Sequence, residues 1–253
     1  MWTLDSKAEP PRWRLADPSP QHLASFSTRR GGVSVAPFDS MNLGRSSGDD
    51  LAAVEANRAR LLAALGLSPA HLATAGQVHG AGVRIVEAPG HHPECDALVT
   101  TRTDLVIAVS AADCLPILFL APGGAAAAHA GWRGLVAGVA AATLVELARV
   151  AATGVPAVTI HFGPCIRSCC FQVGSEVARQ FPADVVESRA GSLYVDLPAA
   201  ARRSLLNAGA VSEAISDIGA CTACEPHWYY SYRRDHGRTG RLWGVAGVRS
   251  RSA

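Results

Sequence analysis

The chain has 253 residues, of which 49% are hydrophobic and 17% are charged, and its 23 Lys and Arg against 21 Asp and Glu give a formal net charge of +2. This composition excludes a disordered chain, and because no basic run is interleaved with aromatic residues it argues against nucleic-acid binding. The N-terminus lacks a signal-peptide pattern and no apolar stretch is long enough to cross a bilayer, so we expect a cytoplasmic protein without membrane contact.

The first part of the chain predicts an extended lead-in followed by a helix. Residues 1–20 are rich in proline and predict an extended segment that closes with a first strand. Asp49 and Asp50 precede an apolar stripe that ends just before Gly66. This is the pattern of a capped amphipathic helix over residues 51–65.

The middle of the chain predicts a sheet that is covered on both faces. Short apolar runs with the length of buried strands occupy residues 83–86, 96–100, 105–109 and 116–120. The small residues 125–128 continue as a strand into His129, and a long apolar helix is expected over residues 135–151.

The last part of the chain predicts a strand and two further helices. We expect the strand at 157–162, a short helix at 176–181, and a helix at 198–208 with a proline near its start and Gly209 beyond its end. Residues 249–253 predict a frayed tail. Because no linker or repeat interrupts the sequence, we expect a single domain over residues 1–253 with loosely alternating strands and helices, a mixed α/β architecture.

Three polar motifs lie at the ends of predicted strands: residues 77–80 precede a strand, residues 111–116 join two strands, and residues 129–134 join a strand to a helix. Loops at strand ends can converge on one crevice although they are distant in sequence. The motifs contain His79, Cys114 and His129, and two neutral imidazoles with one thiolate suit zinc and leave a fourth tetrahedral position for water or substrate. The competing interpretation is that the histidines are hydrogen-bonded turn residues and the cysteine is a small buried hydrophobe.

A wider set of motifs resembles the YfiH-like family. Besides the three motifs above, the resemblance rests on Thr-Arg-Arg-Gly-Gly-Val-Ser at 28–34, Asn-Leu-Gly at 42–44, Gly-Pro-Cys-Ile at 163–166, Ser-Tyr-Arg-Arg-Asp at 231–235 and Thr-Gly-Arg at 239–241. Members of this family have been called multicopper polyphenol oxidase or laccase-domain proteins, and more recently purine nucleoside phosphorylase with adenosine deaminase activity. The resemblance covers most of the chain, from about residue 25 to residue 246.

This resemblance implies an α+β (mixed α/β) fold, a single domain with mixed β-sheets flanked by helices and related to that of a Cys–His toxin deamidase. It also implies that His79, Cys114 and His129 hold a metal, zinc or alternatively copper. The sequence departs from the family at Gln172, where the family often shows Glu.

Two arginines and one aspartate are further candidates for the site. Arg133 lies just before the helix predicted from residue 135, where free N–H groups and the helix dipole favour an anion such as phosphate. Arg29 lies in a glycine-flanked turn, and its guanidinium offers a bidentate fork to phosphate oxygens. Either arginine could instead be solvated or ion-paired. Asp113, next to Cys114, is a hydrogen-bond acceptor or general acid/base for the site, or alternatively a strand-end cap.

The chain has seven cysteines. Because this number is odd and a chain of this size does not need disulfides to fold, we expect them to be thiols. Cys221 and Cys224 have Cys-x-x-Cys spacing, but no second pair or nearby histidine completes a zinc site. We interpret them as structural thiols, and Cys165, Cys169 and Cys170 as small packed residues.

Several histidines and tyrosines are ambiguous in the sequence. His91 and His92 form a loop pair that is expected to face solvent. Tyr229, Tyr230 and Tyr232 can stack on a purine base, although aromatic residues at alternating spacing more often face a core.

The leading functional hypothesis is a zinc-dependent purine nucleoside enzyme. Its substrates would be phosphate and adenosine, inosine or guanosine, with deamination of adenosine to inosine as a second reaction. Cys114, Asp113 and Arg133 are the predicted catalytic residues, and Arg29 and Arg133 the predicted substrate-binding residues. The alternatives are a Cys–His hydrolase or amidase acting on cell-wall precursors, a copper-dependent polyphenol oxidase, and a binding module. The oligomeric state is left open.

Overall fold

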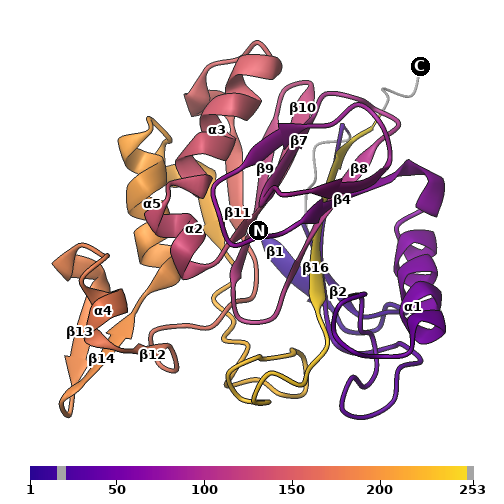
Figure 1. The fold of residues 1–253 in the computed structure, drawn as a ribbon. Coiled ribbons are helices and arrows are strands. Elements are labelled where there is room, and N and C mark those ends of the chain that lie inside the picture. The colour runs from indigo at the N-terminus through magenta and orange to yellow at the C-terminus, as the bar shows by residue number, and fades with distance from the viewer. Residues whose placement is uncertain (16–20, 250–253) are drawn as a thin grey trace.

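The computed structural model describes residues 1–15 and 21–249. Its strands form three sheets and its helices flank them, which confirms the mixed α/β fold class (Figure 1). In order across the sheet, the seven-stranded sheet consists of β1 (Trp2–Asp5), β2 (Arg12–Leu15), β3 (His22–Ser27), β16 (Leu242–Val248), β8 (Val106–Ala111), β4 (Leu72–Gly76) and β6 (Gly90–Pro93).

The second sheet has six strands and the third has three. The six-stranded sheet consists of β15 (Ile215–Asp217), β11 (Thr159–Phe162), β9 (Leu115–Ala121), β10 (Gly124–Ala130), β7 (Ala97–Thr100) and β5 (Val83–Ile85). The three-stranded sheet consists of β12 (Gln172–Val173), β14 (Ser192–Val195) and β13 (Val186–Arg189).

The helices are α1 (Leu51–Ala64), α2 (Trp132–Val136), α3 (Val139–Val150), α4 (Ser175–Ala178) and α5 (Leu197–Asn207). In the part of the chain that the structure describes, four short 3₁₀ turns each lead into a strand: η1 (Pro69–His71), η2 (Val155–Ala157), η3 (Ala183–Val185) and η4 (Ser212–Ala214). Within the described residues, no helix has both the length and the apolar character that a membrane span requires.

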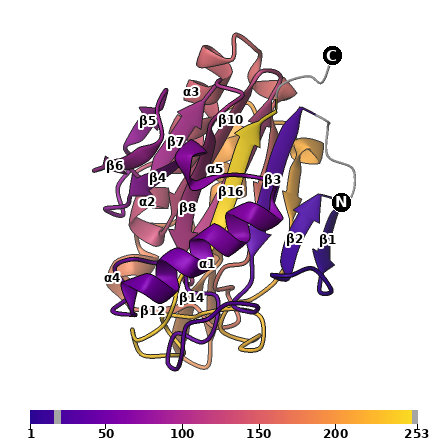
Figure 2. The ribbon, with the colours of Figure 1, turned by 90° about the vertical axis from the view of Figure 1, so that its right-hand side faces the viewer.

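The two large sheets pack face to face, and helices cover their outer faces (Figures 1 and 2). Along β9, Ile117 and Phe119 point toward α3 and α5, whereas Leu118 and Leu120 point into the interface with the seven-stranded sheet. On the other side, Leu61 of α1 packs against that sheet. Because both faces of β9 are covered, its residues form a continuous apolar run without alternation, as the sequence predicted.

Two predicted helices agree closely with the structure. α1 begins after Asp50, whose side chain accepts a hydrogen bond from the Ala52 backbone N–H, and α5 begins after Asp196, which caps it in the same way. Their ends lie within one residue of the prediction.

Other predicted boundaries were wrong. The helix expected over 135–151 begins at Trp132 and is divided into α2 and α3 at Gly138, whose φ of 88° is incompatible with a continuous helix. The helix expected over 176–181 is limited to Ser175–Ala178. The lead-in contains two strands, β1 and β2, which pair antiparallel.

Parts of the predicted lead-in and of the predicted tail are not among the described residues. Residues 16–20 of the lead-in and residues 250–253 of the predicted tail lie outside the described residues. At the start of that tail, the backbone N–H of Arg249 donates a hydrogen bond to the Gln21 carbonyl at 2.8 Å.

Candidate metal centre and active-site pocket

The ends of three strands bring His79, Cys114 and His129 together. His79 follows β4, Cys114 joins β8 to β9, and His129 lies near the end of β10. One potential ligand atom from each residue lies within 4.8 Å of the other two. The two imidazole rings are 4.8 Å apart between centroids and nearly perpendicular, at 87°.

Unusual backbone conformations form the two loops that carry His79 and Cys114. His79 has a φ of 62° and Asp113, which precedes Cys114, has a φ of 86°. Non-glycine residues are uncommon in this left-handed region and often occur at functional sites. At the third loop, a Cβ added to Gly131 would lie 3.0 Å from the Cys114 sulfur and 3.2 Å from the His79 ring. A side chain at Gly131 would therefore crowd the three candidate ligands.

Asp96, which the sequence analysis placed only in a strand, organises this centre. Its carboxylate is fully buried and accepts a hydrogen bond from Nδ1 of His129 at 2.9 Å. It also accepts from the backbone N–H groups of Val78, His79 and Gly80, at 3.2, 2.9 and 2.7 Å. With Nδ1 donating to Asp96, the Nε2 atom of His129 is the nitrogen left to bind a metal.

Gln77 fixes the same loop from its other side. Its Nε2 donates to the Ser110 carbonyl at 2.7 Å, and its Oε1 accepts from the Ser110 backbone N–H at 2.7 Å. The side chain thus continues the pairing of β4 with β8 beyond the last paired strand residues.

The three donors fit a transition metal of the zinc type. A thiolate and two imidazoles are ligands that zinc prefers, and three protein ligands correspond to an open site. The electrostatics favour the ionised thiol: although burial alone would raise its pKa, the charge and hydrogen bonding of His129 and His79 lower the pKa of Cys114 to about 6. Burial lowers the pKa of His129, but the Cys114 charge and Asp96 outweigh it and raise that pKa to about 9.

These residues line a pocket with a volume of about 700 Å³, which is in the usual range for a small-molecule site. Arg133, Arg233 and Arg241 also line it, together with Phe171 and Tyr232. The Arg133 guanidinium lies over the indole of Trp132, 4.4 Å from the centre of the ring. The side chains of Arg233 and Arg241 donate hydrogen bonds to main-chain carbonyl groups. Within the described residues, none of the three forms an ion pair with a carboxylate.

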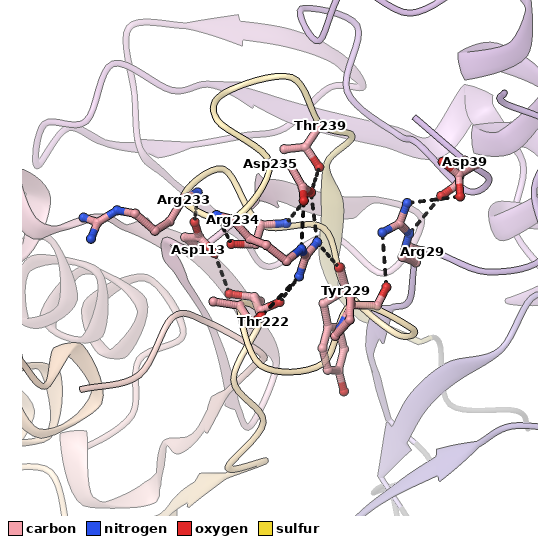
Figure 3. A network of polar contacts seen from close by, with 12 residues as sticks. Arg29, Asp39, Asp113, Thr222, Tyr229, Arg233, Arg234, Asp235 and Thr239 are labelled. Carbon is pink, nitrogen blue, oxygen red and sulfur yellow. Dashed lines mark hydrogen bonds and ion pairs between the residues drawn. The ribbon is translucent and has the colours of Figure 1, made fainter. Parts of the chain in front are cut away.

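The structure separates the two arginines proposed from the sequence. Arg133 lies in the pocket, in the first turn of α2 and not before it. Arg29 is outside the pocket lining: its guanidinium bonds to the carbonyl and the carboxylate of Asp39 (Figure 3). It also donates to the Pro226 carbonyl and lies 4.7 Å from the centre of the Tyr230 ring. Arg29 is therefore occupied by structural contacts, and the sequence analysis missed Arg233 and Arg241.

Asp113 lines the pocket and ties together two loops of its wall. Its Oδ1 accepts from the Thr222 hydroxyl at 2.6 Å and its Oδ2 from the Arg233 backbone N–H at 2.7 Å (Figure 3). In the same loop Arg234 bonds to both oxygens of Asp235, at 2.7 and 2.9 Å, and to the Thr222 carbonyl at 2.7 Å. These contacts fix the loop that presents Arg233.

The tyrosines and the histidine pair largely follow the expectations from the sequence. Tyr229 and Tyr230 are fully buried in the core, and of the three tyrosines only Tyr232 lines the pocket. His91 is exposed, as expected, and it also lines the pocket, but it lies in strand β6 rather than in a loop. In addition, the sulfurs of four cysteines predicted to be separate packed thiols lie within 4.8 Å of one another: Cys169, Cys170, Cys221 and Cys224.

The model of the family described as multi-copper polyphenol oxidoreductase laccase matches residues 23–249. The chain belongs to this family. Among similar members, the purine nucleoside phosphorylase of Deinococcus radiodurans is 40% identical over 233 residues, which cover 88% of each chain. The purine nucleoside phosphorylase YfiH of Escherichia coli is 39% identical over 249 residues, covering 94% of this chain and 97% of that protein.

The fold of the family is also seen in a solved structure. The crystal structure of YlmD from Geobacillus stearothermophilus matches with a TM-score of 0.89 and 32% identity, covering 94% of this chain and 96% of that one. The resemblance to YfiH-like proteins stated from the sequence motifs is confirmed.

Proposed function

We propose that this chain is a zinc-dependent purine nucleoside phosphorylase that also deaminates adenosine to inosine. One observation carries the proposal: a single pocket contains the ligand set of an open zinc site, formed by His79, Cys114 and His129, and three arginines without carboxylate partners among the described residues. Relatives of similar length that carry the name purine nucleoside phosphorylase support it.

Two features of the candidate ligands favour a metal. Cys114 is poised as a thiolate, and once His129 is neutral, Asp96 holds the tautomer whose Nε2 is free. When bound, zinc would supply Lewis-acid chemistry and lower the pKa of water at its open position. Binding of zinc at neutral pH requires His129 to release its proton, since only a neutral imidazole ligates.

Phosphate is assigned to the arginine side of the pocket. In phosphorolysis a phosphate oxygen forms a bond to the ribose C1′ as the glycosidic bond to the purine breaks, which yields the base and ribose 1-phosphate. Arg133, Arg233 and Arg241 would neutralise the phosphate and orient it through charge-assisted hydrogen bonds. Phe171 and Tyr232 are the aromatic side chains available to stack on the base.

Asp113 is assigned a positioning role. Both of its oxygens already accept hydrogen bonds from the loop that carries Arg233, so its contacts are explained without proton transfer. The expected effect of Asp113→Asn is a raised KM for phosphate with unchanged zinc content.

The test is phosphorolysis by the purified, zinc-loaded protein. Inosine, adenosine or guanosine is incubated with phosphate, and free base, ribose 1-phosphate and inosine are measured by chromatography. Arg133→Ala is expected to lower kcat/KM by about 10- to 100-fold, because one charge-assisted hydrogen bond contributes about 1.5–3 kcal/mol. Arg149→Ala, which removes an exposed arginine paired with Glu146 on α3, is the matched control. Absence of both base and inosine from the wild-type reaction would reject the proposal.

A second candidate, a Cys–His hydrolase or amidase, is favoured by the contact of Asp96 with His129 beside Cys114. This order of acid, imidazole and thiol is that of a thiol nucleophile with its base. Chelation discriminates between the two, because a Cys–His hydrolase keeps its activity without metal whereas the proposed phosphorylase loses it. Metal analysis of the same sample also tests the copper oxidase reading, which requires several copper ions per chain.

A further inference from the structure

A second group of potential metal ligands lies outside the pocket. It consists of Cys169 and Cys170, in the turn after Ile166, and Cys221 and Cys224, in the loop after β15. More than 50 residues separate the two pairs in sequence, so only the tertiary fold brings them together. All four are free thiols in the structure.

The sulfur atoms have the spacing of a tetrahedral thiolate site. Four sulfurs at ~2.3 Å from one zinc ion lie ~3.8 Å from one another. The Cys169 sulfur is 3.5 Å from that of Cys221 and 3.6 Å from that of Cys224, and the Cys170 sulfur is 3.3 Å from that of Cys224. All six pairs lie within 4.8 Å. Small adjustments of side-chain torsions would therefore place all four sulfurs around one ion.

The main chain holds the two cysteine segments together independently of the sulfurs. Cys165 and Cys221 form a parallel β-bridge, in which the Cys165 backbone N–H donates to the Ala220 carbonyl at 3.4 Å and the Thr222 N–H donates to the Cys165 carbonyl at 3.0 Å.

We propose that Cys169, Cys170, Cys221 and Cys224 bind one zinc ion in a closed, structural site that is separate from the candidate catalytic centre. Four thiolates complete the coordination of zinc and leave no open position, so the ion would serve to hold the fold. This proposal does not depend on the reaction performed in the pocket.

The site would fix one wall of the active-site pocket. Phe171, which directly follows Cys170, lines the pocket, and Thr222, which directly follows Cys221, donates to Asp113. An ion shared by the two cysteine pairs would cross-link the segments that carry these groups. The same ion would thereby keep the Phe171 face of the pocket in place.

The first test is zinc content per chain, measured by mass spectrometry of metals in protein purified under reducing conditions. We expect about two zinc ions in the wild type, and about one in both Cys114→Ala and the double variant Cys169→Ser with Cys224→Ser. The two substituted thiols of the double variant are exposed, so their replacement leaves the core packed. Cys95→Ser, which belongs to neither cysteine group, is the matched control and should keep the wild-type content.

The second test uses Co²⁺ in place of zinc in the Cys114→Ala variant, in which only the four-cysteine site can ligate through sulfur. Tetrahedral Co²⁺ with thiolate ligands has strong visible and charge-transfer absorption, and this spectrum should disappear in the triple variant that also carries Cys169→Ser and Cys224→Ser. Loss of all zinc in Cys114→Ala, or peptide mapping that finds disulfides among the four cysteines, would overturn the proposal. If the wild type holds zinc at the four-cysteine site but none in the pocket, the proposed function would be rejected instead.

Discussion

Replacing Asp96 by Asn tests how the candidate metal centre is held. The carboxylate accepts from His129 Nδ1 and from three consecutive backbone N–H groups, with all four donors within 3.2 Å. An asparagine keeps the shape, but it loses the charge, and its NH₂ group cannot accept any of these bonds. Whichever way the amide is turned, at least one buried donor is left facing another donor.

Two effects of known size follow from Asp96→Asn. Removing the carboxylate partner of a metal-binding histidine typically weakens metal affinity by about 10- to 100-fold. Leaving a buried donor without an acceptor costs about 1–3 kcal/mol of unfolding free energy. Because burial alone would raise the Asp96 pKa but the bonds from His129 and the loop lower it, the stabilising contribution should be present at neutral pH and lost as the pH falls through the lowered pKa.

Competition with a chromophoric chelator measures the zinc affinity, and urea denaturation of the metal-free protein measures the stability. Asp104→Asn is the control, since Asp104 is 58% exposed in its side chain and pairs with Arg102 at the surface. That control should change the unfolding free energy by less than about 0.5 kcal/mol. An Asp96→Asn protein with wild-type zinc affinity and stability would refute the assignment of Asp96 as the organising residue.

Three further outcomes are expected. In metal-free protein, the rate of Cys114 alkylation should rise with pH through a midpoint near 6, because the neighbouring histidines outweigh burial and lower the thiol pKa; a midpoint near the ordinary value of 9 would contradict this. Gly131→Ala should weaken zinc binding in the chelator assay because its methyl group would crowd the Cys114 sulfur, whereas Gly154→Ala, which meets nothing closer than 3.6 Å, should not. Phe119→Ala should lower the unfolding free energy by about 3–5 kcal/mol in urea denaturation, since the ring is fully buried between β9 and the covering helices.

Local patterns determined several parts of the fold before any tertiary contact was considered. The cap at Asp50, the proline near the start of α5 and the apolar runs of β7 to β10 are properties of neighbouring residues, so the sequence predicts them well. β16 escaped prediction because its seven residues include two glycines, Gly244 and Gly247, and glycine weakens a strand pattern. Close packing explains the first: a Cβ at Gly244 would lie 3.1 Å from the Phe26 ring.

The break in the helix after β10 was a matter of local conformation that the residue types did not reveal. The run of apolar residues continues through Gly138, and glycine is tolerated within helices at a modest cost. In the structure Gly138 adopts a left-handed conformation, so α2 and α3 are separate helices. The consequence for the site is that Arg133 lies within a short helix of its own.

For the site, the sequence motifs made His79, Cys114 and His129 candidate metal ligands, and the resemblance to the YfiH-like family is what favoured them over buried turn residues. Tertiary structure alone decided which partners surround them. Asp96 contacts His129 only because β7 pairs with β10. Arg29 forms an ion pair with Asp39 outside the pocket. The physical reason is that a hydrogen bond or ion pair depends on where distant segments meet, and that placement follows from the packing of whole sheets rather than from the residues next to each group.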